Sequence, residues 1–360
     1  MPLNAYITFG RSGLRVSPFA LGSMTFGEDL GWGSSVADAE AILARYLELG
    51  GNFIDTANLY TNGHAEKIIG DFITAGRVRR DHLVLATKFF FNLYPEDPNG
   101  GGASRKAIME QCEQSLRRLQ TDYIDLYWLH QWDRLTPIEE TMRALDDLVA
   151  AGKIRYIGFS DTPAWKIAQA QTIAQFRGWA PIIAVQLEYS LQQRTVEGEL
   201  IPMAQELGLA ATPWSPLNNG VLTGKYTRQN AGMVKGDRGK WMPSLTEKDY
   251  ELIDTVGEIA QELETTIAAV ALAWVQGRPG VTSTIIGART LKQLDENLTA
   301  LDVQLSPAHV ATLDKLTEPP LDFPSQIIRT SFNGSHAGAT VNGIPSTVMY
   351  PSLLNNEKAR

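Results

Sequence analysis

Short apolar runs alternate with helical patterns along most of this chain, and that alternation limits the possible folds more than any other feature. The runs read FALGS, NFIDT, LVLATK, YIDLYWLH, YIGFS, IAVQLEY, LAATPW and STIIGA. Their apolar residues are largely consecutive, which is typical of parallel strands that are covered on both faces. With the helical patterns between them they make about eight strand–helix units, the number that closes a (β/α)8 TIM barrel.

Caps and prolines mark the predicted helices. Ser104 is expected to cap a helix over residues 104–119, and Pro137 to open the next one. Thr162 is expected to cap the helix after that, with Pro163 as its first residue. The segment TLKQLDENLTAL is predicted as the last helix of the series.

The remaining residues lie before the first unit, in two long connections and in a tail. Residues 6–17 predict a β-hairpin. No low-complexity linker divides the chain, so residues 1–360 are predicted to form a single barrel domain, with a tail over 318–360 that could be a lid or an oligomer contact. Residues 89–103 and 214–248 follow the third and seventh strands. Because active sites of such barrels lie at the carboxyl ends of the strands, we interpret both as substrate-binding loops.

Composition and charge argue against several functions. The net charge is −8 and there is no long basic run, so neither nucleic acid nor an anionic membrane is an expected partner. The single Cys112 excludes an intrachain disulfide, and the five histidines lack metal-ligand spacing, so no metal is predicted. The first residues lack a signal peptide's apolar region, and the longest apolar segment, TIAAVALAWV, is too short to span a bilayer and is predicted as a core helix. A cytoplasmic protein is the default expectation.

Four polar residues stand at or just beyond the ends of three successive strands. Asp55 ends the second predicted strand, Lys88 the third and His130 the fourth, while Tyr60 lies just beyond the second. Singly, such residues are usually turn residues, solvated lysines or packing aromatics. Because the strand ends of a barrel converge on one mouth, we expect these four side chains to lie together.

Together they could transfer a proton. A tyrosine has a pKa of about 10, which a neighbouring ammonium lowers, so Lys88 is expected to lower the pKa of Tyr60. Asp55 would hold Lys88 charged and aimed, and a neutral His130 could orient a substrate carbonyl by a hydrogen bond. Tyr60 would then act as the general acid that protonates a developing alkoxide. No side chain can supply the hydride, which therefore requires a nicotinamide cofactor.

Two segments resemble the aldo-keto reductase superfamily. NFIDTANLYTNGHAE is similar to its D-T-A-x-x-Y-G-x-S-E segment, although Asn62–Ala65 replace the shorter glycine-serine turn. QSLRRLQTDYIDLYWLH is similar to the signature S-L-x-x-L-x-x-D-Y-x-D-L-x-x-x-H. The resemblance runs from the hairpin to about residue 315. It implies a bacterial-type aldo/keto reductase, related to the potassium-channel β-subunit branch, that reduces aldehydes or ketones with NADPH. Asp55, Tyr60, Lys88 and His130 would be its catalytic tetrad.

The resemblance also implies cofactor contacts near the nicotinamide. The turn GFSD is similar to a G-x-S-N turn that binds the carboxamide, so that Ser160 matches and Asp161 replaces the asparagine. Gln186 is implied as a further carboxamide ligand, and Trp214 as the ring that stacks on the nicotinamide. SPLNNGVLTGKY resembles the loop that folds over the pyrophosphate, where the candidates are Ser215, Leu217, Gly220 and Lys225.

A last segment, IIGARTLKQLDENL, resembles the family's adenosine-phosphate site. The candidate contacts there are Gly287, Ala288, Arg289, Gln293, Glu296 and Asn297. The N-terminus of the following helix would favour a phosphate. Arg289 is expected to bind the adenosine 2′-phosphate through its planar guanidinium, which favours NADPH/NADP+ over NADH.

Two alternative functions remain open at this point. A barrel aldolase could use Lys88 to form a Schiff base with a carbonyl substrate, but the cofactor segments would then have no purpose. A regulatory subunit of the same fold could bind cofactor with weak turnover, as the potassium-channel β subunits of the family do. The sequence predicts neither the physiological aldehyde or ketone nor the oligomeric state.

Overall fold

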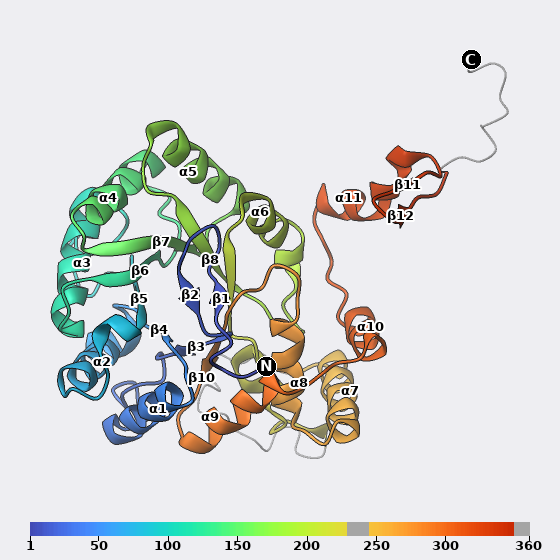
Figure 1. The fold of residues 1–360 in the computed structure, drawn as a ribbon, viewed down its shortest axis with the longest axis horizontal. Helices are drawn as coiled ribbons and strands as arrows, with labels where there is room; N and C mark the ends of the chain where they lie inside the picture. Colours follow the sequence, from blue (N-terminus) through green and yellow to red (C-terminus); the bar gives the residue numbers. More distant parts are fainter. Residues whose placement is uncertain (229–244, 349–360) are drawn as a thin grey trace.

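Eight parallel strands form a nearly closed barrel in the computed structural model, which describes residues 1–228 and 245–348 (Figure 1). The strands pair in the order β10-β3-β4-β5-β6-β7-β8-β9, and an isolated bridge between Ala211 and Val281 lies beside the gap between β9 and β10. They are β3 (Phe19–Gly22), β4 (Phe53–Asp55), β5 (Val84–Phe89), β6 (Ile124–Leu129), β7 (Ile154–Ser160), β8 (Ile182–Glu188), β9 (Ala210–Trp214) and β10 (Thr284–Gly287). All eight coincide with the predicted apolar runs, which confirms the (β/α)8 barrel. Parts of the predicted loop 214–248 and of the tail lie outside the described residues.

Helices surround the barrel in chain order (Figure 1). Those that alternate with the strands are α1 (Val36–Glu48), α2 (His64–Thr74), α3 (Arg105–Leu119), α4 (Ile138–Ala150), α5 (Ala164–Arg177), α6 (Leu200–Leu207), α8 (Ile267–Gln276) and α9 (Leu291–Leu298). Three more are α7 (Glu247–Glu262), which precedes α8, and α10 (Pro307–Leu316) and α11 (Ser325–Ser331), which follow the barrel.

The helix starts were predicted in part. Ser104 caps α3 as expected, since its hydroxyl accepts a hydrogen bond from the amide of Ala107. The prediction that Thr162 caps α5 is wrong, because its Oγ1 donates to the carbonyl of Ser160 at 2.8 Å. Pro163 is itself the N-cap and not the first helical residue, and Pro137 stands in the same position before α4. A proline there cannot supply a capping side chain, so these two helices begin without one.

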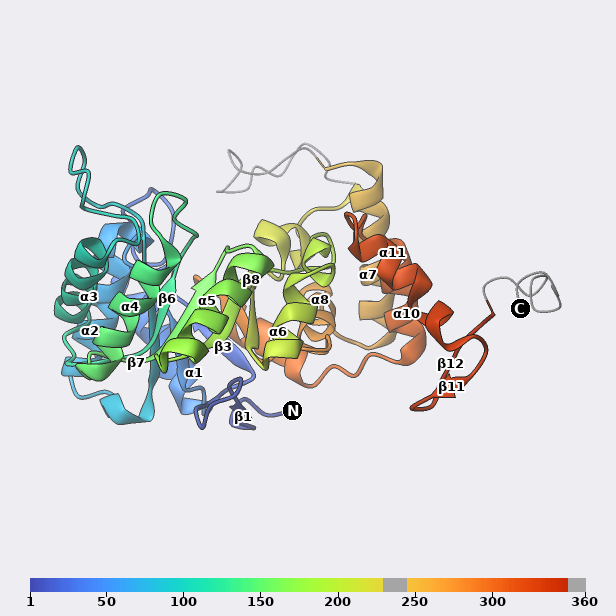
Figure 2. The same ribbon diagram turned by 90° about the horizontal axis from the view of Figure 1, so that it is seen from above.

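The predicted hairpin closes the amino-terminal end of the barrel. Strands β1 (Ile7–Thr8) and β2 (Arg15–Val16) pair antiparallel, and the amide of Arg11 donates to the carbonyl of Gly208 at 2.9 Å. Phe9 packs edge-on against Phe53 of β4, with ring centroids 5.4 Å apart, in an apolar cluster that fills the barrel. The long connection after β5 lies at the opposite end, where the strands have their carboxyl ends (Figure 2).

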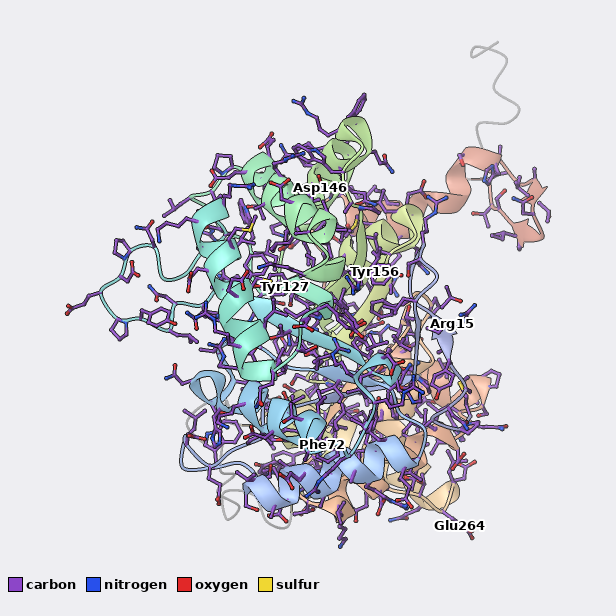
Figure 3. All side chains as sticks on the ribbon, turned by 60° about the vertical axis from the view of Figure 1, so that its left-hand side comes forward. Arg15, Phe72, Tyr127, Asp146, Tyr156 and Glu264 are labelled. Carbon is purple, nitrogen blue, oxygen red and sulfur yellow. The ribbon has the colours of Figure 1, made fainter. Side chains whose placement is uncertain are left out.

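A larger apolar layer lies between the outer face of the sheet and the helices. Phe72 of α2 and Tyr127 of β6 belong to it (Figure 3). Cys112 and Trp274 are also buried there, and the burial of Trp274 confirms the core helix expected for the segment TIAAVALAWV. Among the described residues, no helix is both long and apolar enough to cross a membrane.

The segment after α10 extends away from the barrel in both views (Figures 1 and 2). It contains α11 and a small antiparallel pair, β11 (Thr340–Val341) with β12 (Ile344–Pro345). Ser325 ties its start to the body, since its hydroxyl donates to the carbonyl of Gly198 at 2.9 Å.

Candidate active site

The four polar residues predicted at the strand ends converge at the carboxyl end of the barrel. Asp55 ends β4, Lys88 lies one residue before the end of β5, and His130 directly follows β6. Tyr60 begins the short 3-10 helix η1 (Tyr60–Gly63) that follows β4. The Lys88 ammonium donates to the Asp55 carboxylate, to the carbonyl of Thr56 at 2.8 Å and to the Tyr60 hydroxyl at 3.1 Å. The His130 ring lies edge-on to the Tyr60 ring, with centroids 6.1 Å apart.

The Lys88–Asp55 pair is completely enclosed, with exposed fractions of 0% and 1%. Burial is the largest single influence and lowers the pKa of Lys88, but the charges and hydrogen bonds of Asp55 and Tyr60 together outweigh it, so the pKa of Lys88 is raised. Burial also raises the pKa of Asp55, against the opposing pull of Lys88. Gln186 of β8 donates from Nε2 to Oδ2 of Asp55 at 3.0 Å, which leaves this carboxylate bonded at both oxygens. The pair therefore presents a fixed ammonium to Tyr60.

The pKa of Tyr60 is shifted in the direction opposite to the one predicted from the sequence. Burial is the largest influence and raises the pKa of its phenol above 10, while the charge of Lys88 lowers it by a smaller amount. The predicted effect of Lys88 thus has the right sign, but the expectation of a lowered pKa is wrong. The sequence alone could not show how deeply the phenol is enclosed. With a raised pKa, Tyr60 is a phenol, which can donate a proton.

His130 is held neutral by its surroundings. Burial, aided by the nearby charge of Lys88, moves its pKa well below 6.5. The ring packs edge-on against Phe91, with centroids 4.9 Å apart, and its Nδ1 is buried without a hydrogen-bond partner in the described part of the chain. A neutral imidazole keeps one N–H for donation.

Backbone strain marks the same end of the barrel. Phe90, Asp161 and Ser215 have φ angles of 133°, 40° and 52°, although none of them is glycine. Each directly follows a barrel strand, β5, β7 and β9 respectively. Non-glycine residues in such conformations cost about 1–3 kcal/mol each and gather at functional sites. This strain could not be predicted from the sequence, because no residue type at these positions demands a positive φ.

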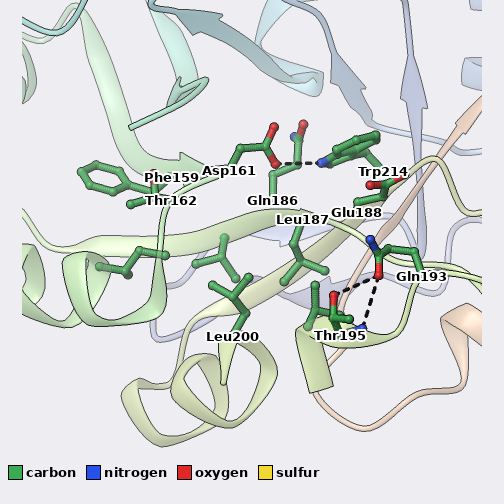
Figure 4. A pocket seen from close by; sticks show the side chains of 13 residues that line it. Phe159, Asp161, Thr162, Gln186, Leu187, Glu188, Gln193, Thr195, Leu200 and Trp214 are labelled. Carbon is green, nitrogen blue, oxygen red and sulfur yellow. Dashed lines mark hydrogen bonds between the residues drawn. The ribbon is translucent and has the colours of Figure 1, made fainter. Parts of the chain in front are cut away.

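A pocket of about 290 Å³ lies along β8, and none of Asp55, Tyr60, Lys88 and His130 lines it (Figure 4). Asp161, Gln186 and Trp214 line it, and the Trp214 indole Nε1 donates to Oδ1 of Asp161 at 3.1 Å. Ser160, also predicted here, is buried, and its hydroxyl has no hydrogen-bond partner among the described residues. Burial raises the pKa of Asp161. The indole of Trp214 can stack on a flat ring, and the Ser160 hydroxyl and the Gln186 amide can hydrogen-bond a carboxamide. These residues therefore fit the predicted nicotinamide.

The residues predicted at the pyrophosphate follow β9. Gly220 has a φ of 95° within the short helix η4 (Asn218–Thr223), and the Lys225 ammonium lies 3.4 Å from where its Cβ would be. Leu217 packs against the core, and the hydroxyl of Ser215 accepts from the amide of Asn219 at 3.1 Å. The backbone of Gly220 and the Lys225 charge therefore lie together, as an anion site requires.

The residues predicted at the adenosine phosphate form the turn between β10 and α9. Asn297 donates from Nδ2 to the carbonyl of Gly287 at 3.0 Å, and Oε1 of Gln293 accepts from the amide of Arg289 at 2.8 Å. Asn297 and Gln293, two of the six predicted contacts, thus stabilise the turn through hydrogen bonds to its backbone. Ala288 is buried, and Glu296 pairs with Lys292 at 3.6 Å. Among the described residues, no heavy atom lies within 4 Å of where a Cβ of Gly287 would be.

Sequence reasoning missed two features of the catalytic cluster. The carbonyl of Thr56 accepts from Lys88, and Gln186 was given only a cofactor role although it also bonds to Asp55. Side-chain identity cannot reveal a backbone acceptor. The bond from Gln186 depends on β4 and β8 facing each other across the barrel, which no local pattern reports.

Comparisons with known proteins agree with this geometry. The sequence model of the Aldo/keto reductase family matches residues 18–318. An uncharacterized oxidoreductase of Bacillus subtilis, YrpG, is 40% identical over 83% of this chain and 92% of its own length. A probable voltage-gated potassium channel subunit beta of Oryza sativa is 38% identical over 83% of this chain and 91% of its own. An aryl-alcohol dehydrogenase [NADP(+)] of Phanerodontia chrysosporium is 34% identical over 84% of this chain and 83% of its own length.

Proposed function

The chain belongs to the aldo/keto reductase family, and from that premise we propose that it reduces the carbonyl group of aldehydes or ketones to an alcohol with NADPH. One observation carries the proposal: a fully buried Lys88 ammonium, fixed by Asp55, lies 3.1 Å from the Tyr60 hydroxyl. Family membership and oxidoreductase relatives support the reaction class.

The four residues divide the work as follows. The neutral His130 donates a hydrogen bond to the carbonyl oxygen and holds it beside Tyr60. When bound, the nicotinamide supplies the hydride that goes to the carbonyl carbon. As the carbon–oxygen π bond breaks, Tyr60 gives its proton to the oxygen, and Lys88 stabilises the phenolate that remains. Asp55 keeps Lys88 protonated and in place. Tyr60 then regains a proton from water.

The cofactor contacts form part of the proposal. Ser160, Asp161 and Gln186 would hold the carboxamide, and Trp214 would cover one face of the ring. Gly220 and Lys225 would bind the pyrophosphate, and Arg289 the 2′-phosphate. The relative named as an NADP(+) enzyme supports this choice of cofactor.

Replacing Arg289 with alanine is expected to weaken NADPH binding about ten- to hundred-fold, because a charged hydrogen bond to phosphate is lost. NADH lacks that phosphate, so its affinity should change much less. Quenching of tryptophan fluorescence gives both dissociation constants. Lys292→Ala, in the first turn of α9 and paired with Glu296, is the control and should spare both affinities. Equal losses for NADH and NADPH in the Arg289 variant would remove the 2′-phosphate argument.

The aldolase alternative loses support from the geometry. A Schiff base requires a lysine amine with a free lone pair. Lys88 is instead a buried ammonium with three acceptors, and its pKa is raised. We therefore do not favour this function.

A regulatory subunit is the second candidate, and the Oryza relative favours it. Turnover separates the two functions. The purified protein should oxidise NADPH in the presence of a panel of aldehydes and ketones, with Tyr60→Phe as the background. NADPH binding without turnover above that background would favour the regulatory subunit.

A further inference from the structure

Two tryptophans and two basic side chains form a rim next to the candidate active site. Trp132 and Trp165 pack edge-on, with ring centroids 5.4 Å apart. The Lys166 ammonium lies 4.6 Å from the Trp165 centroid and 5.5 Å from that of Trp132, and the Arg134 guanidinium lies 5.8 Å from Trp132. We call these four residues the tryptophan rim.

The rim adjoins the residues proposed to act on the carbonyl. Trp132 is two residues beyond His130, and two residues span at most about 7 Å. The amide of Trp132 donates to the carbonyl of Asp161 at 3.5 Å, which ties the loop after β6 to the loop after β7. Trp165 lies at the start of α5, the helix that follows this second loop. A molecule bound at His130 can therefore extend along the rim.

The described part of the chain places no anion in an ion pair with the two cations of the rim. Within residues 1–228 and 245–348, neither Arg134 nor Lys166 forms an ion pair, and the Lys166 ammonium donates only to the uncharged side chain of Gln169, at 2.8 Å. Asp133, between the two rim residues of its loop, accepts from the amides of Ala103 and Leu135 and from Thr136. Its carboxylate is thus engaged in holding the loop. The two rim cations still outnumber this one carboxylate, and a local excess of positive charge in a chain of net charge −8 is suited to an anion.

The rim also exposes aromatic surface to solvent, which is energetically unfavourable. Trp165 is 57% exposed, although a side chain of this size is usually more fully buried. An exposed aromatic pair with adjacent cations binds a flat ring by stacking and an acidic group by charge. Phe91, edge-on to His130, continues the aromatic lining inward.

We propose that the tryptophan rim binds the ring and the acidic group of an aromatic aldehyde or ketone that carries a carboxylate, while its carbonyl lies at Tyr60 and His130. This inference rests on the proposed function, for which it names a substrate class. The opposing view is that the two cations only cover the indole rings with their alkyl stems. The two views differ in what happens when the substrate's charge is removed and its shape kept.

The test compares 4-carboxybenzaldehyde with its uncharged methyl ester in the wild type and in the double variant Arg134→Gln, Lys166→Gln. The ratio of kcat/KM for acid over ester should fall about three- to ten-fold in the double variant, as expected for two exposed charge contacts. Added salt should lower the ratio in the wild type but not in the variant. Trp165→Ala should reduce kcat/KM for both substrates, because both lose the ring contact. Lys315→Gln on α10, an exposed lysine distant from α5 in both ribbon views, should leave the ratio unchanged.

An unchanged ratio in the double variant, with both substrates turned over, would overturn the inference and leave the proposed function standing. If the wild type turns over neither substrate, the panel of aldehydes and ketones still decides the proposed function, and calorimetric titration tests the tryptophan rim separately. In that titration 4-(hydroxymethyl)benzoate should bind more tightly than its methyl ester in the wild type, by a margin that the double variant loses. Equal affinities in the wild type would also overturn the inference that the tryptophan rim binds an acidic group.

Discussion

Phenylalanine in place of Tyr60 is expected to lower kcat for carbonyl reduction about 10²- to 10⁴-fold, the usual contribution of a positioned general acid. The change removes only the hydroxyl that Lys88 contacts at 3.1 Å and keeps the ring that packs beside His130. NADPH affinity, measured by fluorescence quenching, should stay within about two-fold, because no proposed cofactor contact is lost. Stopped-flow measurement of a single turnover gives the rate of the chemical step.

The pH dependence of the wild-type rate is a second test of Tyr60 as the general acid. The active form needs Tyr60 protonated and His130 neutral. The pKa of Tyr60 is raised above 10 by burial, and that of His130 is lowered well below 6.5 by burial and by Lys88. The required forms therefore dominate between these limits, and kcat should be level across that range and fall only outside it. Retained turnover in Tyr60→Phe, or a loss of wild-type rate well below pH 10, would contradict the role of Tyr60 as the acid.

Replacing Lys88 with methionine is expected to have the largest effect on stability. It leaves the Asp55 carboxylate, 1% exposed, without its cation, and breaking a buried pair in this way costs about 3–5 kcal/mol. Activity should also fall, because no ammonium remains to stabilise the Tyr60 phenolate. Urea unfolding gives the free energy, and the single-turnover assay gives the rate.

A second variant separates the two effects. Asp55→Asn combined with Lys88→Met removes both charges, so most of the lost stability should return. The rate should not return, since Tyr60 still lacks its cation. If the double variant regained activity along with stability, Lys88 would be structural only. If Lys88→Met were as stable as the wild type, the buried pair would not be charged.

The sequence predicted the barrel and the catalytic cluster for the same reason. Consecutive apolar runs report burial on both faces, and barrel geometry brings Asp55, Lys88 and His130 to one end once their strands are placed. The predictions that failed depended on local surroundings. Thr162 was expected to cap a helix, but its hydroxyl donates to the carbonyl at the end of the preceding strand. The effect of burial on the pKa of Tyr60 is larger than that of Lys88.

Features that arise between distant segments left little signal in the sequence. Gln186 reaches Asp55 across the barrel, and the rim joins Trp132 of one loop to Trp165 of the next helix. The strained φ of Phe90 likewise has no residue signature, because its cause is the path of the chain after β5. Each of these contacts is set by packing between strands and loops, and not by residues next to one another in the chain.

The central claim is that this chain moves a hydride from NADPH to a carbonyl carbon while Tyr60 supplies the proton. Its most direct test is mass spectrometry of the alcohol formed from an aromatic aldehyde with NADPH deuterated at both C4 positions, in ordinary water. The account predicts one deuterium on the carbinol carbon of each alcohol formed, with product formation almost abolished in Tyr60→Phe. An alcohol without deuterium, or no alcohol from any carbonyl compound while NADPH binds, would contradict it.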